Sequence, residues 1–120
     1  MTATLDPLEG DLVAFAISTT GSTARVSASG EIDSSTAPQL RERLDEVLDS
    51  GISELVVDLG GVTFLDSAGL CVLAAAHRRA TDQGVRLRVR ASSRAVVRPM
   101  QITGLWDLLA VERVETDAAR

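Results

Sequence analysis

Apolar and polar positions near the beginning of the chain predict a β-hairpin. Residues 12–17 form an apolar run, and residues 24–32 continue with alternation at Val26 and Ala28. A turn cluster of threonine, glycine and serine separates them at residues 19–22. Runs of this kind bounded by turn residues are typical of two paired strands.

The next segment has the spacing of an amphipathic helix. Thr36-Ala37-Pro38-Gln39 has the form of a capping box with proline in the first turn, and Gly51 is a natural stop. Charged side chains fill one face of the segment. Apolar side chains recur on the other at Ala37, Leu40, Leu44, Val47 and Leu48. We therefore expect a helix between Thr36 and Gly51.

The centre of the chain predicts a buried strand, a loop and a long helix. Residues 54–59 are almost continuously apolar, as expected for a central strand of a parallel sheet. We interpret Gly60-Gly61 as the turn after this strand. A helix should follow Asp66 and run to about Gln83, with Gly84 as its stop. Its first two turns are apolar almost all round, so we expect them to be buried.

The last quarter of the chain predicts one more strand and a less regular helix. Residues 85–90 alternate strictly, so three aliphatic side chains face one way and three arginines the other. A helix is expected from the Ser92-Ser93 pair to Ile102, but Pro99 should make it short, kinked or broken. After the stop at Gly104 we expect a helical turn and, at residues 111–114, a last short strand.

This order of elements indicates an α/β fold. The hairpin followed by βαβ units with right-handed crossovers gives a mixed, mainly parallel sheet. The arginine face of residues 85–90 meets water, so the helices should pack mostly on one face of the sheet.

Composition excludes several classes of function. The 120-residue chain carries a net charge of -5, and all 12 of its basic residues are arginine, which argues against non-specific binding of nucleic acid or anionic membranes. The single Cys71, read as a small buried hydrophobe, allows no internal disulfide, and there is no Cys/His cluster for a metal. The N-terminus lacks a signal-peptide pattern, and the apolar run 70–76 is too short for membrane insertion. We expect a soluble cytoplasmic protein without a cofactor.

Asp66-Ser67 is the most informative pair in the sequence, and two roles are open for it. An Asp or Ser before an apolar helix caps the unpaired amides of its first turn. A serine hydroxyl at a helix N-terminus beside a carboxylate is also the best candidate for a switch. The only histidine, His77, lies about 15 Å further along the helix, so a Ser-His pair is excluded. Asp33 should join Asp66 at the carboxyl edge of the sheet, unless it is a simple turn residue.

Three segments together resemble the STAS-domain family, the anti-sigma-factor antagonists. Gly30-Glu31-Ile32-Asp33, with Thr36 to Arg41, is similar to the first family signature. The second signature is more specific, and residues 57–70, which include Phe64-Leu65-Asp66-Ser67-Ala68-Gly69-Leu70, resemble it. Thr103-Gly104-Leu105 matches a late Gly-Leu turn of the family. The resemblance predicts a single STAS domain at residues 11–114, with flexible termini at 1–10 and 115–120.

The resemblance implies a fold, a function and a set of partners. The fold is an α/β sheet of four to five strands with helices mostly on one face. The chain would not be an enzyme. Its unphosphorylated form would bind an anti-sigma factor, a serine kinase with a histidine-kinase-like ATPase fold, and release the sigma factor. Phosphorylation of Ser67 would end the interaction, and a serine phosphatase would restore it. The implied partner-binding residues are Asp33, Ser34, Asp66, Ser67, Ala68, Gly69 and Leu70.

Two other functions remain open at this point. A STAS domain can also be the adaptor subunit of a lipid or anion transport assembly. A small nucleotide-binding protein is the third hypothesis, but Gly60-Gly61 lacks the spacing of a phosphate-binding loop. Thr63, Ser92 and Ser93 are alternative phosphorylation sites.

Overall fold

The computed structural model describes residues 13–114, which form one five-stranded sheet with four helices. The predicted flexible termini, 1–10 and 115–120, lie outside the described residues. The elements in chain order are β1 (Val13–Thr20), β2 (Thr23–Ile32), α1 (Ala37–Leu48), β3 (Glu54–Leu65), α2 (Ser67–Gln83), β4 (Arg86–Ala91), α3 (Arg94–Thr103), α4 (Leu105–Leu108) and β5 (Glu112–Arg113).

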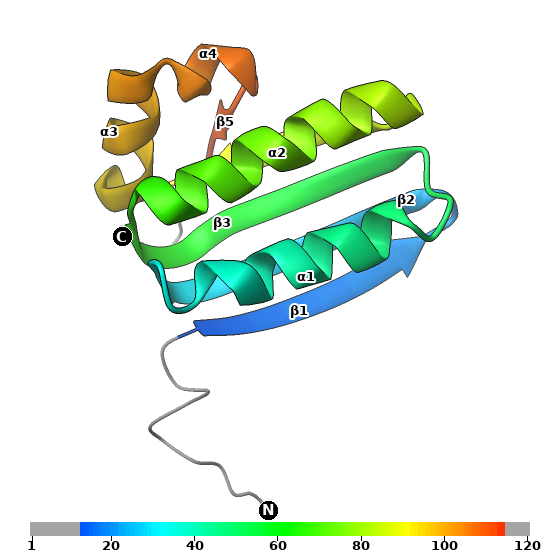
Figure 1. Cartoon of the computed structure of the whole chain (residues 1–120), viewed down its shortest axis with the longest axis horizontal. Coiled ribbons are helices and arrows are strands. Elements are labelled where there is room, and N and C mark those ends of the chain that lie inside the picture. The colour runs from blue at the N-terminus through cyan, green and yellow to red at the C-terminus, as the bar shows by residue number, and fades with distance from the viewer. Residues whose placement is uncertain (1–12, 115–120) are drawn as a thin grey trace, which may run out of the picture.

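The strands lie side by side in the order in which they occur in the sequence. β1 and β2 are antiparallel and form the predicted hairpin, whereas β2, β3, β4 and β5 are parallel. Figure 1 shows α1 and α2 lying across the same face of this sheet, with α3 and α4 at one side. The predicted α/β fold, with a mixed and mainly parallel sheet covered on one face, is confirmed.

The core lies between the sheet and the two long helices. Fully buried side chains on the strands, such as Val26, Val57 and Val89, face Leu40 and Leu73 on the helices. Because a strand side chain alternates between the two faces, this one apolar face accounts for the pattern of the sequence.

The opposite face of the sheet is open and carries a ladder of charged side chains. Arg25 of β2 pairs with Asp58 of β3, and Arg88 of β4 pairs with Glu54 at 3.4 Å and with Glu112 at 3.3 Å. The prediction that the arginines of β4 face away from the helices is confirmed. These cross-strand ion pairs give most of that arginine face a structural role.

The glycine pair of β3 lies within the strand and not in a turn. β3 continues past Leu59 to Leu65, and its pairing with β2 shifts register twice. Gly61 lies against Ser29, where an added Cβ would approach the Ser29 Cβ to 2.7 Å. The prediction of a loop after Leu59 was therefore wrong, because glycine here permits a bulged strand to keep pairing at close range.

α1 has the predicted bounds but not the predicted cap. The hydroxyl of Thr36 makes no cap hydrogen bond to the helix. It donates instead to the carbonyl oxygen of Glu31 at 2.8 Å and accepts from the amide of Asp33 at 2.9 Å. The capping-box prediction was wrong, and the buried Thr36 fastens the loop before α1 to the end of β2.

α3 is a ten-residue helix that contains Pro99. Of the outcomes predicted for this segment, a short helix is confirmed, and the helix is not broken at the proline. Proline removes one backbone hydrogen bond. The buried side chains of Val96, Val97 and Met100 keep this amphipathic helix packed on the domain despite that loss. Gly104 ends α3 in the left-handed conformation, with a φ of 83°, as predicted.

Candidate phosphorylation and partner-binding site

Two neighbouring strands end together at the site. Ile32, the last residue of β2, is the register partner of Leu65, the last residue of β3. The amide of Asp66 donates to the carbonyl oxygen of Ile32 at 3.1 Å. Asp33 and Asp66 therefore follow adjacent strand ends, and the prediction that they share the carboxyl edge of the sheet is confirmed.

Asp66 caps α2. Its backbone is extended, with φ −109° and ψ −169°, as is usual for the residue before a helix. One carboxylate oxygen accepts from the amide of Ala68 at 2.9 Å and from the amide of Gly69 at 3.4 Å. Two of the unpaired amides of the first turn are thus satisfied by Asp66 alone. The capping interpretation is confirmed for this member of the pair.

Ser67 has no such structural role. It is the first residue of α2 and is exposed. Within residues 13–114 its hydroxyl forms no hydrogen bond, since Asp66 already serves as the cap. The hydroxyl stands at the positive end of a helix dipole, where an added anionic group is electrostatically tolerated. The geometry can therefore accept modification of Ser67 without loss of a fold contact.

Asp33 organises the loop between β2 and α1. Its Oδ1 accepts from the Ser35 hydroxyl at 2.7 Å, from the Ser35 amide at 2.9 Å and from the Thr36 amide at 3.2 Å. These bonds, that of the Ser35 hydroxyl first, hold the pKa of Asp33 below its ordinary value of 3.8. Asp33 therefore presents a fixed negative charge beside the start of α2. Ser34 is exposed in the same loop.

The residues after Ser67 divide between the surface and the core. Ala68 is half-buried, whereas Gly69 and Leu70 are buried. An added Cβ on Gly69 would lie 2.4 Å from a methyl carbon of Leu65 and 2.8 Å from one of Ile32. Gly69 thus lets α2 sit directly on the paired strand ends. A direct contact of these three residues with a partner stays a prediction.

Cys71 lies on the outer side of α2 and is exposed, which corrects the prediction that it is a buried hydrophobe. The expectation that the first two turns of α2 are buried all round was likewise wrong. Leu70, Leu73 and Ala76 cover the sheet, so the helical period places Cys71 and Ala75 toward solvent. The exposed side of α2 therefore begins with Ser67 and continues through Cys71, one turn further along.

The sequence reading missed an exposed aromatic residue beside the site. Phe64 is 47% exposed, and its register partner on β2 is Glu31. Because the neighbouring pair Ile32 and Leu65 faces the helices, Phe64 and Glu31 face the opposite side. Strict alternation would have placed Phe64 on the same face as the buried Val62. The bulge between these two residues, where the pairing with β2 shifts register, turns Phe64 outward, and no local sequence pattern signals it.

The three alternative phosphorylation sites are engaged with the backbone. The hydroxyl of Thr63 donates to the carbonyl of Gly30 at 3.3 Å. Those of Ser92 and Ser93 donate to β3 carbonyls at 3.3 and 3.1 Å. Ser67 differs from all three because its hydroxyl is not used by the described fold.

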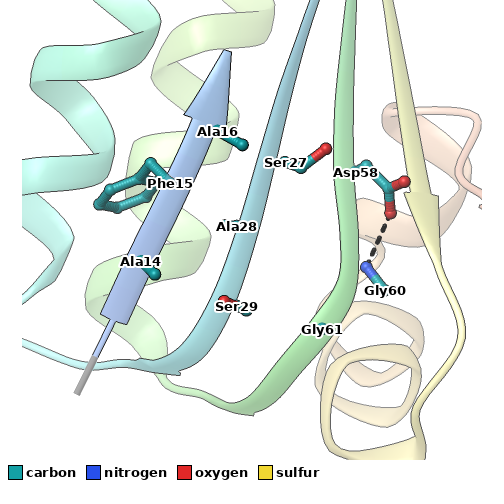
Figure 2. Close-up of a pocket in the computed structure, with 9 residues that line it drawn as sticks. All are labelled: Ala14, Phe15, Ala16, Ser27, Ala28, Ser29, Asp58, Gly60 and Gly61. Atoms are coloured by element: carbon teal, nitrogen blue, oxygen red, sulfur yellow. Dashed lines mark hydrogen bonds between the residues drawn. The ribbon is translucent and has the colours of Figure 1, made fainter. Parts of the chain in front are cut away.

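A hollow of about 400 Å³ lies on the open face of the sheet (Figure 2). Phe15 and small side chains of β1, β2 and β3 line it. Asp58 borders it and accepts from the Gly60 amide at 2.8 Å. Partial burial acts to raise the pKa of Asp58, but the Gly60 amide and the Arg25 guanidinium outweigh it and lower the pKa below 3.8. Gly60 and Gly61 lie in a strand and not at a helix N-terminus, which removes the basis for a phosphate-binding loop.

Other kinds of site find no support in residues 13–114. These residues hold no cluster of three or more His, Cys, Asp or Glu side chains placed to bind a metal ion. None of the helices within the same range is long and apolar enough to cross a membrane.

Comparisons with known proteins agree with the fold. Residues 15–110 match the family described as "Mlab, STAS domain". The anti-sigma-F factor antagonist RsfB of Mycobacterium tuberculosis is 36% identical over 95 residues, which cover 79% of this chain and 77% of that protein. The anti-sigma-B factor antagonist of Bacillus subtilis is 34% identical over 87 residues, or 72% of this chain and 79% of that protein.

A solved structure is similar over most of its length. The crystal structure of an anti-sigma factor antagonist from Mycobacterium paratuberculosis superposes with a TM-score of 0.79 and 33% identity, covering 85% of this chain and 86% of that one. With sequence and fold in agreement, the chain belongs to the STAS-domain family of anti-sigma-factor antagonists.

Proposed function

We propose that this chain, through a single STAS domain at residues 11–114, is a phosphorylation-controlled antagonist of an anti-sigma factor. In its unphosphorylated form it binds the anti-sigma factor, a serine kinase with a histidine-kinase-like ATPase fold, and the sigma factor is released for transcription. The chain is a ligand and a substrate, not an enzyme, and it acts in the cytoplasm. Its relatives among the antagonists favour this role over that of a transport adaptor.

The proposal rests on the different roles of Asp66 and Ser67 at the start of α2. Asp66 caps α2, and the exposed Ser67 hydroxyl takes no part in the described fold. A kinase can therefore reach the hydroxyl without unfolding the helix. The Ser67 Oγ attacks the γ-phosphorus of ATP, ADP leaves, and the hydroxyl proton passes to a base on the kinase. A serine phosphatase reverses the modification by hydrolysis with water.

Phosphorylation ends binding through charge and size at the surface. A phosphate group adds a charge of about −1.5 to −2 at neutral pH. It stands at the positive end of α2, so the fold of the chain is kept. A partner fitted to the existing carboxylates of Asp66 and Asp33 then meets a third anion and a bulkier side chain. Ser34 and Ala68 lie at the same surface and complete the exposed part of the proposed footprint.

The test is intact-mass spectrometry with peptide mapping after incubation with ATP and candidate anti-sigma kinases from the same genome. The expected result is one added phosphate, located on Ser67. Ser67→Ala is the matched control and should gain none. Phosphate on Thr63, Ser92 or Ser93 would overturn the assignment of the site. A folded protein that no candidate modifies would contradict the kinase relationship.

A further inference from the structure

Three arginine side chains surround a second hollow, at the side of the domain formed by α3 and β5. Arg94, Arg98 and Gln101 of α3 line it together with Val97, and Arg113 of β5 completes it. Its volume is about 380 Å³. We refer to this hollow and its lining residues as the arginine hollow. Among residues 13–114, no carboxylate lines it.

The alternation of β5 explains why Glu112, the neighbour of Arg113, does not offset this positive charge. Glu112 is the register partner of Arg90 and joins the ion pairs of the open face. Arg113 is the partner of Ala91, which faces the helices, so Arg113 lies on the side of α3. Within residues 13–114, Arg94, Arg98 and Arg113 form no ion pair. Arg25, Arg88 and Arg90 of the open face, in contrast, each have a carboxylate partner.

The stability of α3 does not account for these arginines. Arg94 is the first residue of the helix, where the helix dipole disfavours a positive charge. Arg98 follows one turn later, and like charges at this spacing repel each other. Ser93 does not cap the helix, because its hydroxyl donates to the carbonyl oxygen of Val62. Positive charges from α3 and from β5 thus lie close together, and no carboxylate of the described residues pairs with them.

The arginine hollow is held on the same rigid edge as Ser67. Ser92 and Ser93 donate hydrogen bonds to the β3 carbonyls of Gly60 and Val62, at 3.3 and 3.1 Å. These bonds attach the start of α3 to the part of β3 that leads into Ser67. In Figure 1, α3 lies at the end of the sheet where β3 passes into α2. A protein partner that covers Ser67 therefore meets an edge that also carries the arginines.

We propose that the arginine hollow is a second docking point for the anti-sigma partner and receives an acidic side-chain cluster of that protein. The proposal rests on the proposed function. Guanidinium groups bind carboxylates in a bidentate manner, and three of them around one hollow fit several carboxylates at once. Such contacts give specificity and accelerate association. The net charge of -5 argues against nucleic acid as the occupant.

The binding experiment compares three charge reversals with a matched control. The control is Arg86→Glu, because Arg86 is exposed, forms no ion pair within the described residues and lies at the amino end of β4, away from Ser67. Arg94→Glu, Arg98→Glu and Arg113→Glu change the net charge equally. Each should raise the dissociation constant for the cognate kinase at least tenfold, and the dissociation constant should then depend less on salt concentration. Arg86→Glu should change the dissociation constant less than twofold. Arg98→Lys should restore part of the affinity.

Thermal unfolding separates a binding role from a structural one. Arg94→Glu should unfold at the same temperature as the wild type or higher, because it places a negative charge at the start of α3. Weaker binding by a variant of undiminished stability supports docking. If the wild type binds the kinase and all variants bind equally well, the second docking point is wrong and the proposed function stands. If the wild type binds no candidate, the proposed function has failed.

A measurement without the kinase tests which class of ligand the arginine hollow binds, whether or not a cognate kinase has been found. Amide signals of the wild type are followed by NMR during titration with a hexaglutamate peptide, with inorganic phosphate and with a short DNA duplex. Shifts at residues 94–101 and 113 with the peptide, kept in Arg86→Glu and lost in Arg98→Glu, support an acidic protein segment. A response to phosphate or DNA without one to the peptide, or no response at all, overturns the proposal.

Discussion

The amide of Asp66 donates a hydrogen bond to the carbonyl oxygen of Ile32 at 3.1 Å, and this contact fixes the end of β3 to the end of β2. The loop with Asp33 begins directly after one of these residues, and Ser67 follows the other. Both parts of the candidate site are therefore set by the pairing of two strands. A rigid frame of this kind allows a modification to change the surface without changing the fold.

Ser67→Ala should leave the domain folded and permanently able to bind. Because the Ser67 hydroxyl forms no hydrogen bond within the described residues, its removal should change the free energy of unfolding by less than about 0.5 kcal/mol. Urea unfolding checks the stability, and calorimetry checks binding to the kinase before and after incubation with ATP. A loss of more than about 1.5 kcal/mol would show that Ser67 shares the capping role.

Ser67→Asp should stay folded but bind the kinase at least tenfold more weakly, a loss of about 1.4 kcal/mol. The added carboxylate is favourable at the N-terminus of α2 and unfavourable for a partner fitted to Asp66. Ser67→Asn is the control, since it has nearly the same size without the charge. Equal affinities for the Asp and Asn variants would exclude charge as the cause of release.

Asp66→Ala should lower the free energy of unfolding by about 1 kcal/mol, because two amides at the start of α2 lose their acceptor. Asp66→Asn should keep most of that stability, since asparagine caps helices about as well. Denaturant unfolding of Asp66→Ala and Asp66→Asn measures how much the cap contributes to the free energy of unfolding. Any loss of kinase binding in the Asn variant is then due to the missing charge. Equal stability of the Ala variant and the wild type would contradict the capping role.

Much of the fold follows from patterns that act over a few residues. Four elements were predicted: the hairpin, the helix that starts near Thr36, the helix that stops at Gly84 and the alternating strand around Val89. Each has one buried face, and alternation or helical spacing is the local consequence of that. The placement of Asp33 and Asp66 at one edge of the sheet was also predicted, since the ends of parallel strands meet there.

The sequence-based predictions were wrong where contacts between residues distant in sequence determine the structure. Gly61 reads as a turn, yet its close approach to Ser29 keeps it in β3. Thr36 has the sequence position of a cap, but the carbonyl of Glu31 takes its hydroxyl. The exposure of Cys71 depends on which side of α2 covers the sheet. The arginine hollow depends on Arg113 reaching the same side as α3, which sequence spacing alone does not reveal.

Gly69→Ala should destabilise the domain, although alanine is the better helix former by about 1 kcal/mol. The new Cβ would lie 2.4 Å from a methyl carbon of Leu65 and 2.8 Å from one of Ile32, both in the packed core. Overpacking of this kind costs about 1–3 kcal/mol, so a net loss of about 1 kcal/mol is expected. Cys71→Ala, on the exposed side of the same helix, is the control and should change stability by less than about 0.5 kcal/mol. An equally stable Gly69→Ala variant would show that α2 can move away from the strand ends.

Stability should fall on acidification below about pH 4, and Asp58 should contribute to that fall. The Gly60 amide and Arg25 hold the pKa of Asp58 below its unfolded value of 3.8, although partial burial acts in the opposite direction. A lowered folded pKa gives stability that is fully present above the unfolded pKa and is lost as the pH falls through the folded pKa. Asp58→Asn removes this titration. Its urea midpoint should be lower than that of the wild type at pH 6, and the difference should narrow toward pH 3. A difference that is constant over this range would show that Asp58 is not stabilised in its charged form.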